Sequence, residues 1–385
     1  MSGETSRLSQ PITAGVLTAL VGFTSSFAVV LAGLTAVGAT PAQAASGLLV
    51  LCVAQALGML WMSRRHRIPI SLAWSTPGAA LLAGTGIPDG GWPAAVGAFV
   101  VVGVLILLTA LWPRLGELIA MIPAPIAQAM LAGVLLSLCL APVRAVVDDP
   151  AVIAPVIVTW LVLVRFLPRL AVPAAFVVAL IVIWTAGHGG PSGAWLPQVE
   201  TTMPAFEVGA LVGIALPLYV VTMASQNVPG VAVMASYGYQ VPWRETMTVT
   251  GIGTVGSAFG GGHAVNLAAI TAAISAGPDA GTNPKRRWIA SETAAWSYLV
   301  LAVASVALTT LAVSGPPGVV ETVAGLALLG TLGASLSAAV AATEGREAAV
   351  VTFVVAASGV TVGGIGAAFW ALVAGLVTAA VLRRR

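Results

Sequence analysis

The chain alternates between long apolar runs and short polar connections along almost its whole length. Twelve of these runs approach the ~20 residues that a helix needs to cross the hydrocarbon of a bilayer. The pattern therefore predicts twelve membrane-crossing helices, over 15–36, 43–63, 92–112, 122–143, 151–167, 171–187, 208–229, 246–259, 289–313, 317–338, 348–363 and 366–382.

Two further apolar stretches are shorter than these, and each follows a polar, extended lead-in. They read ISLAWSTPGAALLAG at 70–84 and GGGHAVNLAAITAAISAG at 260–277. A chain can leave the helix at membrane depth only where protein or a water-filled cavity satisfies the freed N–H and C=O groups. We therefore predict two half-helices that line a site. A re-entrant plug without ligand contact is the alternative.

Composition and charge support a membrane-embedded chain. Only 8% of the 385 residues are charged and 58% are hydrophobic, whereas soluble domains carry roughly 25% charged residues. Counting each half-helix as a crossing gives fourteen segments. With both termini cytoplasmic, fifteen of the sixteen Lys and Arg residues then lie on the cytoplasmic side, and Arg144 is the exception. This asymmetry explains the net charge of +3 without nucleic acid as a partner. The first span is too long for a removable signal peptide, so we expect it to be retained.

Short words recur at a spacing close to half the chain length. AALLAG at 79–84 resembles AAISAG at 272–277, ALVG at 19–22 recurs at 210–213, and AG at 132–133 recurs at 324–325, with offsets of 193, 191 and 192 residues. Seven segments per half is an odd number, so the second half enters the membrane from the opposite face. The predicted fold is an all-α polytopic membrane protein, built as a 7+7 inverted repeat with half-helices as segments 3 and 10, each preceded by a short extended strand. Many secondary transporters share this architecture.

The half-helices carry the residues that start helices. Gly260, Gly261 and Gly262 form a hinge that lets the backbone bend. Ser75 or Thr76 suits an N-cap, and the proline that follows suits the first turn. Because a helix N-terminus presents unpaired N–H groups and a positive dipole end, two such termini facing each other would make an anion cradle.

Four long strings resemble one family of membrane proteins. They are GFTSSFAVVLAGLTAVGA (22–39), PISLAWSTPGAALLAG (69–84), LYVVTMASQNVPGVAVM (218–234) and GGHAVNLAAITAAISAGPDA (261–280). In this order they resemble the benzoate/proton symporters of bacterial inner membranes. That family is similar in fold to the uracil and xanthine permeases and to the sulfate-type anion carriers. The resemblance covers essentially the whole chain.

The resemblance implies a core domain of segments 1–4 and 8–11 that carries the substrate, and a gate domain of segments 5–7 and 12–14. On this sequence the domain boundaries would be 1–113 and 205–314 for the core, and 114–204 and 315–385 for the gate. The implied activity is import of benzoate with a proton by alternating access. The implied location is the bacterial inner membrane.

An aromatic carboxylate needs hydrogen-bond donors for its charge and an apolar slot for its ring, because carboxyl groups with a pKa of about 4 are ionised at neutral pH. Phe23 and Phe27, spaced i and i+4, are candidates to flank the ring, as are Trp74 and Tyr219. Pro229 removes a helix hydrogen bond to the Ser225 carbonyl and is a second hinge candidate. The candidate donors are Thr24, Ser25, Ser26, Ser71, Ser75, Thr76, Thr222, Ser225, Gln226, Asn227, His263 and Asn266. For the hydroxyls the alternative is helix packing, and for the two phenylalanines it is the core.

One histidine is the candidate residue for carrying the coupled proton. Uracil-type relatives place carboxylates on segments 8 and 10, whereas TMASQNVPG and GGHAVNLAA contain none. Their absence favours an anionic substrate. His263 is the only histidine in a broken segment, and imidazole titrates near neutral pH, so it is the candidate proton carrier. His66 and His188 fall in predicted loops. Alternatively, His263 only fixes the half-helix, and the proton and substrate travel together as the neutral acid.

Other classes of function fit the sequence less well. Cys52 and Cys139 are single cysteines in apolar runs, so we expect neither a disulfide nor a metal site, and no cofactor. An intramembrane enzyme would need a nucleophile and a base or a metal set, and His263 has no neighbouring Asp, Cys or Glu within its segment. An anion channel would need a ring of charges or a repeated filter. A nucleobase or inorganic-anion carrier of the same fold is the alternative within transport. A homodimer remains one option for assembly.

Overall fold

The computed structural model describes residues 2–112, 114, 121–186, 196–269, 271–343, 345–363 and 365–382, with side chains from residue 9 onward. His188 and the Arg383–Arg385 tail of the topology prediction lie outside these residues. The described elements, in chain order, are α1 (Ser2–Thr24), α2 (Phe27–Ala36), α3 (Pro41–His66), β1 (Leu72–Trp74), α4 (Thr76–Ala83), α5 (Gly91–Leu111), α7 (Ala124–Asp148), α8 (Pro150–Phe166), α9 (Pro168–Ala186), α10 (Val208–Ala210), η1 (Leu211–Ala215), α11 (Leu216–Thr222), η2 (Met223–Asn227), α12 (Val228–Ser236), α13 (Trp243–Ala258), β2 (Val265–Leu267), α14 (Ala272–Ala276), η3 (Pro278–Ala280), η4 (Pro284–Arg286), α15 (Trp288–Val313), α16 (Val319–Val340), α17 (Arg346–Ala357) and α18 (Ala367–Leu382).

The predicted segments correspond closely to these helices. Among the described residues, eight helical stretches are long and apolar enough to cross a membrane, and the shorter apolar helices α8 and α18 add two more. The helices α13 and α17 and the two broken segments complete the fourteen. The first predicted span is not one continuous helix. The span predicted over 15–36 is interrupted between α1 and α2 at Ser25 and Ser26, for a reason given below.

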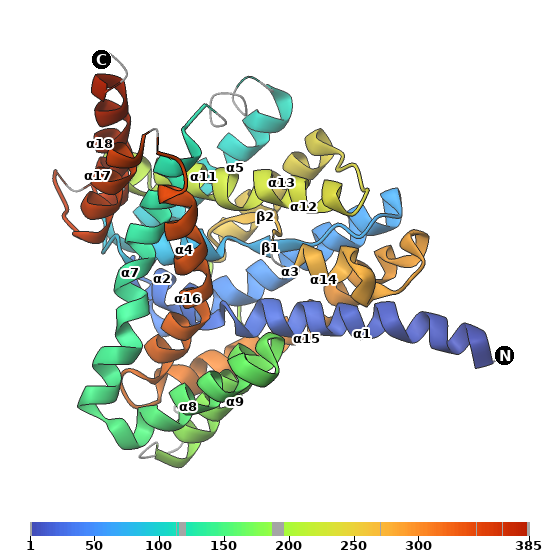
Figure 1. Cartoon of the computed structure of the whole chain (residues 1–385). Coiled ribbons are helices and arrows are strands. Elements are labelled where there is room, and N and C mark those ends of the chain that lie inside the picture. Colours follow the sequence, from blue (N-terminus) through green and yellow to red (C-terminus); the bar gives the residue numbers. More distant parts are fainter. Residues whose placement is uncertain are drawn as a thin grey trace.

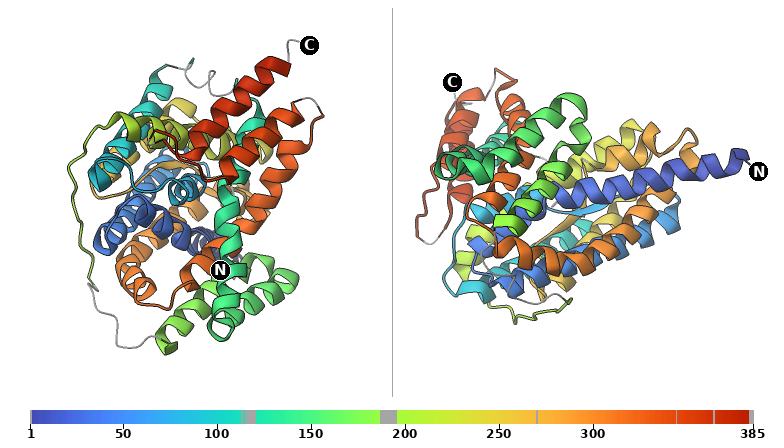
Figure 2. Two further views of the ribbon diagram at one scale, coloured as in Figure 1. Left: turned by 90° about the vertical axis from the view of Figure 1, so that its left-hand side faces the viewer. Right: turned by 90° about the horizontal axis from the view of Figure 1, so that it is seen from below.

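The packing of the helices shows the inverted repeat. Helix α3 packs along α15, and its counterpart α13 in the second half packs along α5, so each half lends a helix to the other. Helix α3 also packs on α13, and α1 packs along α15, beside which it runs in Figure 1 and in the right-hand view of Figure 2. The helices α7, α8, α9, α16, α17 and α18 form a second group, in which α7 packs on α16 and α17, and α8 packs on α9. The fold is that of a core and a gate. The exact domain boundaries stay a prediction.

The two broken segments meet in a small sheet. Strand β1 pairs with β2 in antiparallel register, with Leu72 opposite Leu267, Ala73 opposite Asn266 and Trp74 opposite Val265. The pairing is extended by the Ser75 N–H, which donates to the Ala264 carbonyl at 2.9 Å. Each strand therefore satisfies the backbone groups that the other frees by leaving the helix, which a chain in the bilayer requires.

The second half-helix is shorter than the sequence pattern indicates. The apolar run after Asn266 stays extended through Leu267, and α14 covers only Ala272–Ala276. The glycine run before the strand forms a turn in which Gly261 has φ +91°, a backbone conformation that favours glycine. A side chain at Gly261 would also approach the Trp92 ring and the Gln43 carbonyl, 3.0 and 3.1 Å from its Cβ. Only glycine suits this turn.

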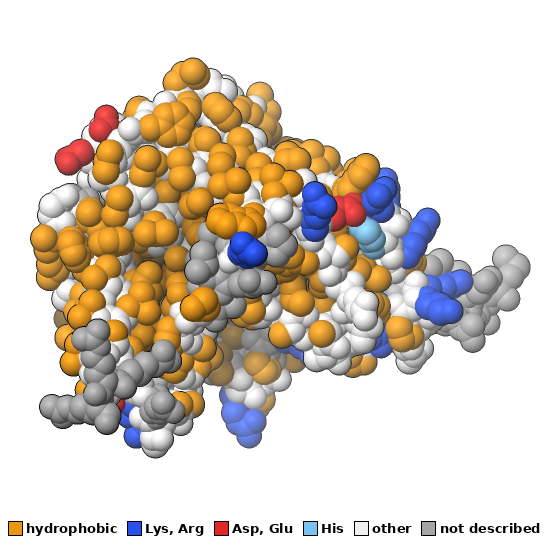
Figure 3. Space-filling model, turned by 90° about the horizontal axis from the view of Figure 1, so that it is seen from above, with side chains coloured by type: hydrophobic (Ala, Val, Ile, Leu, Met, Phe, Trp, Pro, Cys, Tyr) orange, Lys and Arg blue, Asp and Glu red, His pale blue; other side chains and the backbone are white. Residues whose placement is uncertain are grey.

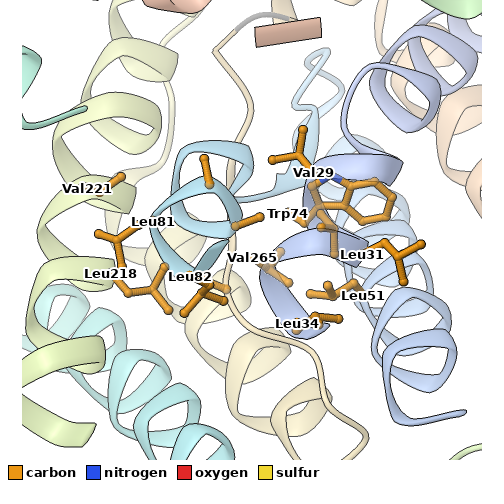
Figure 4. Close-up of a cluster of buried hydrophobic side chains, with 14 of the residues drawn as sticks. Val29, Leu31, Leu34, Leu51, Trp74, Leu81, Leu82, Leu218, Val221 and Val265 are labelled. Atoms are coloured by element: carbon orange, nitrogen blue, oxygen red, sulfur yellow. The ribbon is translucent and has the colours of Figure 1, made fainter. Parts of the chain in front are cut away.

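The first half-helix lies in the centre of the core. Figure 4 shows α4 between α2, which carries Leu31 and Leu34, and α11, which carries Leu218. The contact with α2 is close because Gly33 lies against the Ala79 carbonyl of α4, only 2.3 Å from where a Cβ would be. Fixed neighbours on both sides hold the start of α4 in one place.

The face of the molecule shown in Figure 3 is largely apolar. Figure 3 shows hydrophobic side chains across the face in view, with Lys and Arg side chains gathered mainly toward one end. At that end Arg64 pairs with Glu292, and Arg65 and His66 both pair with Glu245 at 2.9 Å. We call this the basic end of the core. Lipid-facing helices with charged interfacial ends are expected of a membrane-embedded body.

Candidate functional site

An aromatic cluster lies beside the start of α4. The Phe23 ring is 5.3 Å from that of Phe27 and 5.7 Å from that of Trp74, measured between centroids. The Trp74 ring is in turn 6.5 Å from the Tyr298 ring of α15. All four side chains are buried. The cluster brings together three of the four predicted ring contacts, and it comes from α1, α2, β1 and α15.

The break in the first span positions part of this cluster. The Ser25 and Ser26 hydroxyls both donate to the Gly22 carbonyl, at 3.4 and 2.6 Å. Local hydroxyl bonds of this kind compete with the helix ladder, and the helix stops at Thr24. Ser26 Oγ also accepts a hydrogen bond from Trp74 Nε1 at 2.8 Å. The first broken strand is thereby tied to the break between α1 and α2.

The polar part of the site adjoins the aromatic part. Ser75 follows Trp74 directly and is the N-cap of α4, where its hydroxyl accepts from the Gly78 N–H at 3.1 Å. The Thr222 hydroxyl of α11 donates to Ser75 Oγ at 2.8 Å. Ser75 and Thr222 are fully buried, and Thr76 is half-buried. Trp74 in the aromatic cluster and Ser75 in the group of hydroxyls at the N-terminus of α4 are therefore consecutive residues.

The predicted amides lie around β2. Asn227 Oδ1 accepts from the Leu267 N–H at 2.8 Å, so this amide anchors the strand to η2. Asn266 satisfies both ends of its amide when its oxygen accepts from the Ser75 N–H and its nitrogen donates to the Leu267 carbonyl, each at 3.0 Å. These two asparagines hold the sheet and the start of α4 in register.

The eighth segment changes its helical pitch next to these amides. Met223–Asn227 form a π-helical turn that carries Ser225, Gln226 and Asn227. Pro229 lacks an N–H and follows at once, which explains why the regular ladder gives way there. Gln226 is 9% exposed and Ser225 is half-buried. The looser turn near Pro229 that the sequence predicts takes this form.

His263 lies at the entry to β2. Its side chain is fully buried, and its Nδ1 accepts from the Ala264 N–H. The ring stands edge-on to Phe99 of α5, 6.4 Å between centroids. Its Nε2 is buried and has no hydrogen-bond partner among the described residues. A buried polar atom without a partner is uncommon in folded proteins and calls for an explanation.

Three predicted side chains make other contacts. The Tyr219 hydroxyl bonds the Thr109 hydroxyl of α5, and no described contact joins its ring to the aromatic cluster. The Thr24 hydroxyl donates back to the Leu20 carbonyl at 2.7 Å. The Ser71 hydroxyl bonds those of Ser275 and Ser291, so it joins the two half-helix segments to α15. For Thr24 and Ser71 these bonds match the helix-packing alternative.

Two aromatic residues that the sequence pattern does not mark complete the site. Tyr298 is a single tyrosine in an apolar span. A polar ring in such a span was the only feature of the sequence that could have marked Tyr298 as a site residue. Phe176 of α9 packs edge-on against Phe27, 5.4 Å between centroids. Because α9 belongs to the second group of helices, this contact joins the gate to the core. Nothing in the local sequence marks it.

A cavity of about 510 Å³ adjoins the break between α1 and α2. Its inner wall is Ser25 with Val21 of α1, and its outer rim carries Arg169 of α9 and Asp279 of η3. Tyr237, Ala273 and Ile274 close the sides. We call this cavity the vestibule. It lies between α9 and the core elements, so it leads from the surface to the break beside the aromatic cluster.

Comparison with known proteins decides the family. The family model for the benzoate membrane transport protein matches residues 6–381. This chain belongs to the benzoate membrane transport protein family. It is 37% identical over 372 residues to the inner membrane protein YdcO of Escherichia coli K12, and this alignment covers 96% of this chain and 95% of that protein. It is 27% identical over 334 residues to the benzoate membrane transport protein of Acinetobacter baylyi, with 86% and 84% covered.

Solved structures show the same fold for this family member. The transmembrane domain of the cyanobacterial bicarbonate transporter BicA aligns with a TM-score of 0.63 at 15% identity, covering 96% of this chain and 97% of that one. SLC26A9 aligns with a TM-score of 0.63 at 13% identity, covering 96% and 65%. At this identity the likeness concerns the fold alone. The protein is a multi-pass membrane transporter. Among the described residues, no group of three His, Cys, Asp or Glu side chains is arranged to hold a metal ion.

The vestibule predicts a difference in thiol accessibility. In detergent-solubilised protein, a maleimide should label Ser25→Cys, because this position lines the cavity, and should leave Thr222→Cys unlabelled, because that position is fully buried. The native Cys52 and Cys139 are buried and give a low background. The measurement is the extent of labelling by mass spectrometry. Equal labelling of the two variants would contradict the cavity.

Proposed function

We propose that this transporter imports benzoate, or a closely similar aromatic monocarboxylate, together with a proton across the bacterial inner membrane. The core would carry the substrate and move against the gate, which is alternating access around one central site. Both termini and the basic end of the core would face the cytoplasm, in line with the positive-inside rule. The benzoate membrane transport protein of Acinetobacter baylyi supports the substrate class.

The single observation that carries the proposal is the junction at Trp74 and Ser75. Trp74 contributes a ring to the aromatic cluster, and Ser75 caps α4 beside the Thr222 hydroxyl. Benzoate has the same division, with an apolar ring bonded directly to a carboxylate. A ring between Phe23 and Trp74 would place the carboxylate toward the hydroxyls and the positive end of α4. Small rearrangements of the closed cluster would admit it.

The charge of the site favours an anion over a neutral nucleobase. The residues of the aromatic cluster and its adjoining hydroxyls carry no carboxylate, and neither does the stretch 222–230 or 261–269. A fixed carboxylate would repel an anionic substrate. A nucleobase carrier and an inorganic-anion carrier of the same fold are therefore weaker candidates, because the first lacks its usual acidic partners here and the second has no use for the aromatic wall.

Energetics favour coupling to a proton. Moving one negative charge inward against an inside-negative potential costs about 2.3 kcal/mol per 100 mV. An uncoupled benzoate carrier would therefore release its substrate outward. One proton per benzoate cancels this electrical cost and adds the pH gradient as a driving force. The buried Nε2 of His263, which has no partner among the described residues, supports this residue as the proton carrier.

Proteoliposomes test the function. Saturable uptake of labelled benzoate should rise with an acidic exterior, approaching tenfold accumulation per pH unit for one proton, and should not respond to an imposed potential. Protein-free liposomes measure the passive entry of benzoic acid. Unlabelled competitors should inhibit the uptake of labelled benzoate in the order benzoate, substituted benzoates, uracil and sulfate, with benzoate the strongest. Uptake that ignores the pH gradient, or that uracil or sulfate blocks best, would contradict the proposal.

The polar side of the site can be tested at Gln226. Gln226→Ala should raise the half-saturation concentration for benzoate about tenfold, because a hydrogen bond to a charged group is lost. Gln198→Ala is the matched control, since Gln198 is exposed and lies far from η2 in the sequence. Both variants should keep the melting temperature of the parent. An unchanged half-saturation concentration in Gln226→Ala would exclude this side chain from the site.

The proton carrier can be tested at His263. His263→Gln should abolish stimulation by the pH gradient while exchange of internal for external benzoate continues, because exchange needs no net proton movement. His66→Gln is the control, since His66 pairs with Glu245 at the basic end. If His263→Gln keeps its full response to the gradient, the proton travels with the carboxylate as the neutral acid instead.

A further inference from the structure

The charges of the vestibule are confined to its rim. Among the residues that the structure describes, Arg169 and Asp279 are the only Lys, Arg, Asp or Glu side chains that line it, and Arg169 Nη1 lies 2.9 Å from Asp279 Oδ2. Their side chains are 61% and 39% exposed, so both reach the aqueous mouth of the cavity. Everything deeper is apolar or hydroxylic, including Val21, Val172 and Ser25.

This ion pair differs from the others in what it joins. The three other ion pairs of the described residues, Arg64–Glu292, Arg65–Glu245 and His66–Glu245, connect helices within the core. Arg169 is on α9, and Asp279 is on η3, directly after the second half-helix. Arg169–Asp279 is therefore the ion pair that ties the gate to the substrate-bearing segment.

We propose that Arg169 forms a second carboxylate-binding site in the vestibule, at which the substrate displaces Asp279 and so releases the tie between α9 and η3. The inference rests on the proposed function, because it assumes a carboxylate substrate. An aspartate side chain and benzoate present the same two-oxygen anion, and a guanidinium binds either of them through paired N–H groups. The apolar walls at Val21, Val172 and Ile274 provide a surface for the ring.

The exposure of the pair makes such an exchange practicable. An exposed ion pair contributes little because water and salt screen it, so a carboxylate at modest concentration can compete with Asp279. A buried pair of the same geometry would hold Arg169 too firmly. The position of Arg169 on α9 would also let this helix transmit a change at the vestibule to the aromatic cluster. Along the same helix, Phe176 lies seven residues on, about 10 Å deeper, where it contacts Phe27 of the aromatic cluster.

The experiment measures protection of a thiol in the vestibule. The parent is full-length Ser25→Cys in proteoliposomes or detergent, labelled by a maleimide at increasing benzoate concentration. Into it are placed Arg169→Gln, Arg169→Lys and Asp279→Asn. Arg165→Gln is the matched control, because Arg165 is a cation near the start of α9 that does not line the vestibule.

The expected results differ in sign between the two partners. The benzoate concentration for half-maximal protection should rise about threefold in Arg169→Gln, because the cation is lost, and fall about threefold in Asp279→Asn, because the competing carboxylate is lost. Both changes should speed labelling without benzoate, since each removes the tie. Arg165→Gln should match the parent, and Arg169→Lys should stay closer to the parent than Arg169→Gln.

Two outcomes would overturn the inference. One is a half-protection concentration that stays at the parent value in both Arg169→Gln and Asp279→Asn. The other is a parent that transports benzoate but shows no protection of Cys at position 25. A failure of the proposed function looks different, because wild-type protein would then show no saturable benzoate uptake. In that case faster labelling of Asp279→Asn without benzoate would still report the tie.

Discussion

The structure depends on the pairing of two three-residue strands in the centre of a membrane protein. A helix that stops at membrane depth exposes N–H and C=O groups that lipid cannot satisfy. Here β1 and β2 satisfy one another, and Ser75, Asn227 and Asn266 complete the remaining bonds. Because the strands come from opposite halves of the chain, neither broken segment is stable without the other. The inverted repeat supplies both.

This pairing also positions the residues of the proposed site. It places Trp74 at the end of β1, next to the aromatic rings of the first span, and it places Ser75 at the start of α4. The site is therefore divided into an apolar and a polar part by a single peptide step. An aromatic carboxylate matches such a division, whereas a small inorganic anion would use only the polar half.

The gate meets this centre at two levels along α9. Phe176 packs against Phe27 at the aromatic cluster, and Arg169 pairs with Asp279 at the mouth of the vestibule. The first contact is apolar and buried, and the second is charged and exposed to water. In the proposed alternating-access cycle, movement of the core past the gate would have to break both. The exposed ion pair is the weaker one, since solvent screens it, and the vestibule lies between them.

The membrane spans, the two half-helices and the inverted repeat could be predicted because they depend on local properties. Bilayer thickness sets the length of an apolar run, and Gly261 or Pro77 marks a place where a helix cannot simply continue. The spacing of Phe23 and Phe27 predicted that the two rings would lie together, and they do, although the helix breaks between them so that they belong to α1 and α2. The sequence alone thus determined the class of fold, and it pointed to the residues of the candidate site.

The partners of those residues were decided only by the tertiary structure. Trp74 bonds Ser26 across 48 residues, and Thr222 bonds Ser75 across 147. Tyr219 was predicted to flank the ring of the substrate, but its hydroxyl bonds the Thr109 hydroxyl and its ring is not part of the aromatic cluster. The break at Ser25 and the short α14 went unpredicted, because hydroxyl bonds and strand pairing overrode the helical preference of the local sequence. Contacts between distant segments leave no periodic signal, so the chain must fold before they can be known.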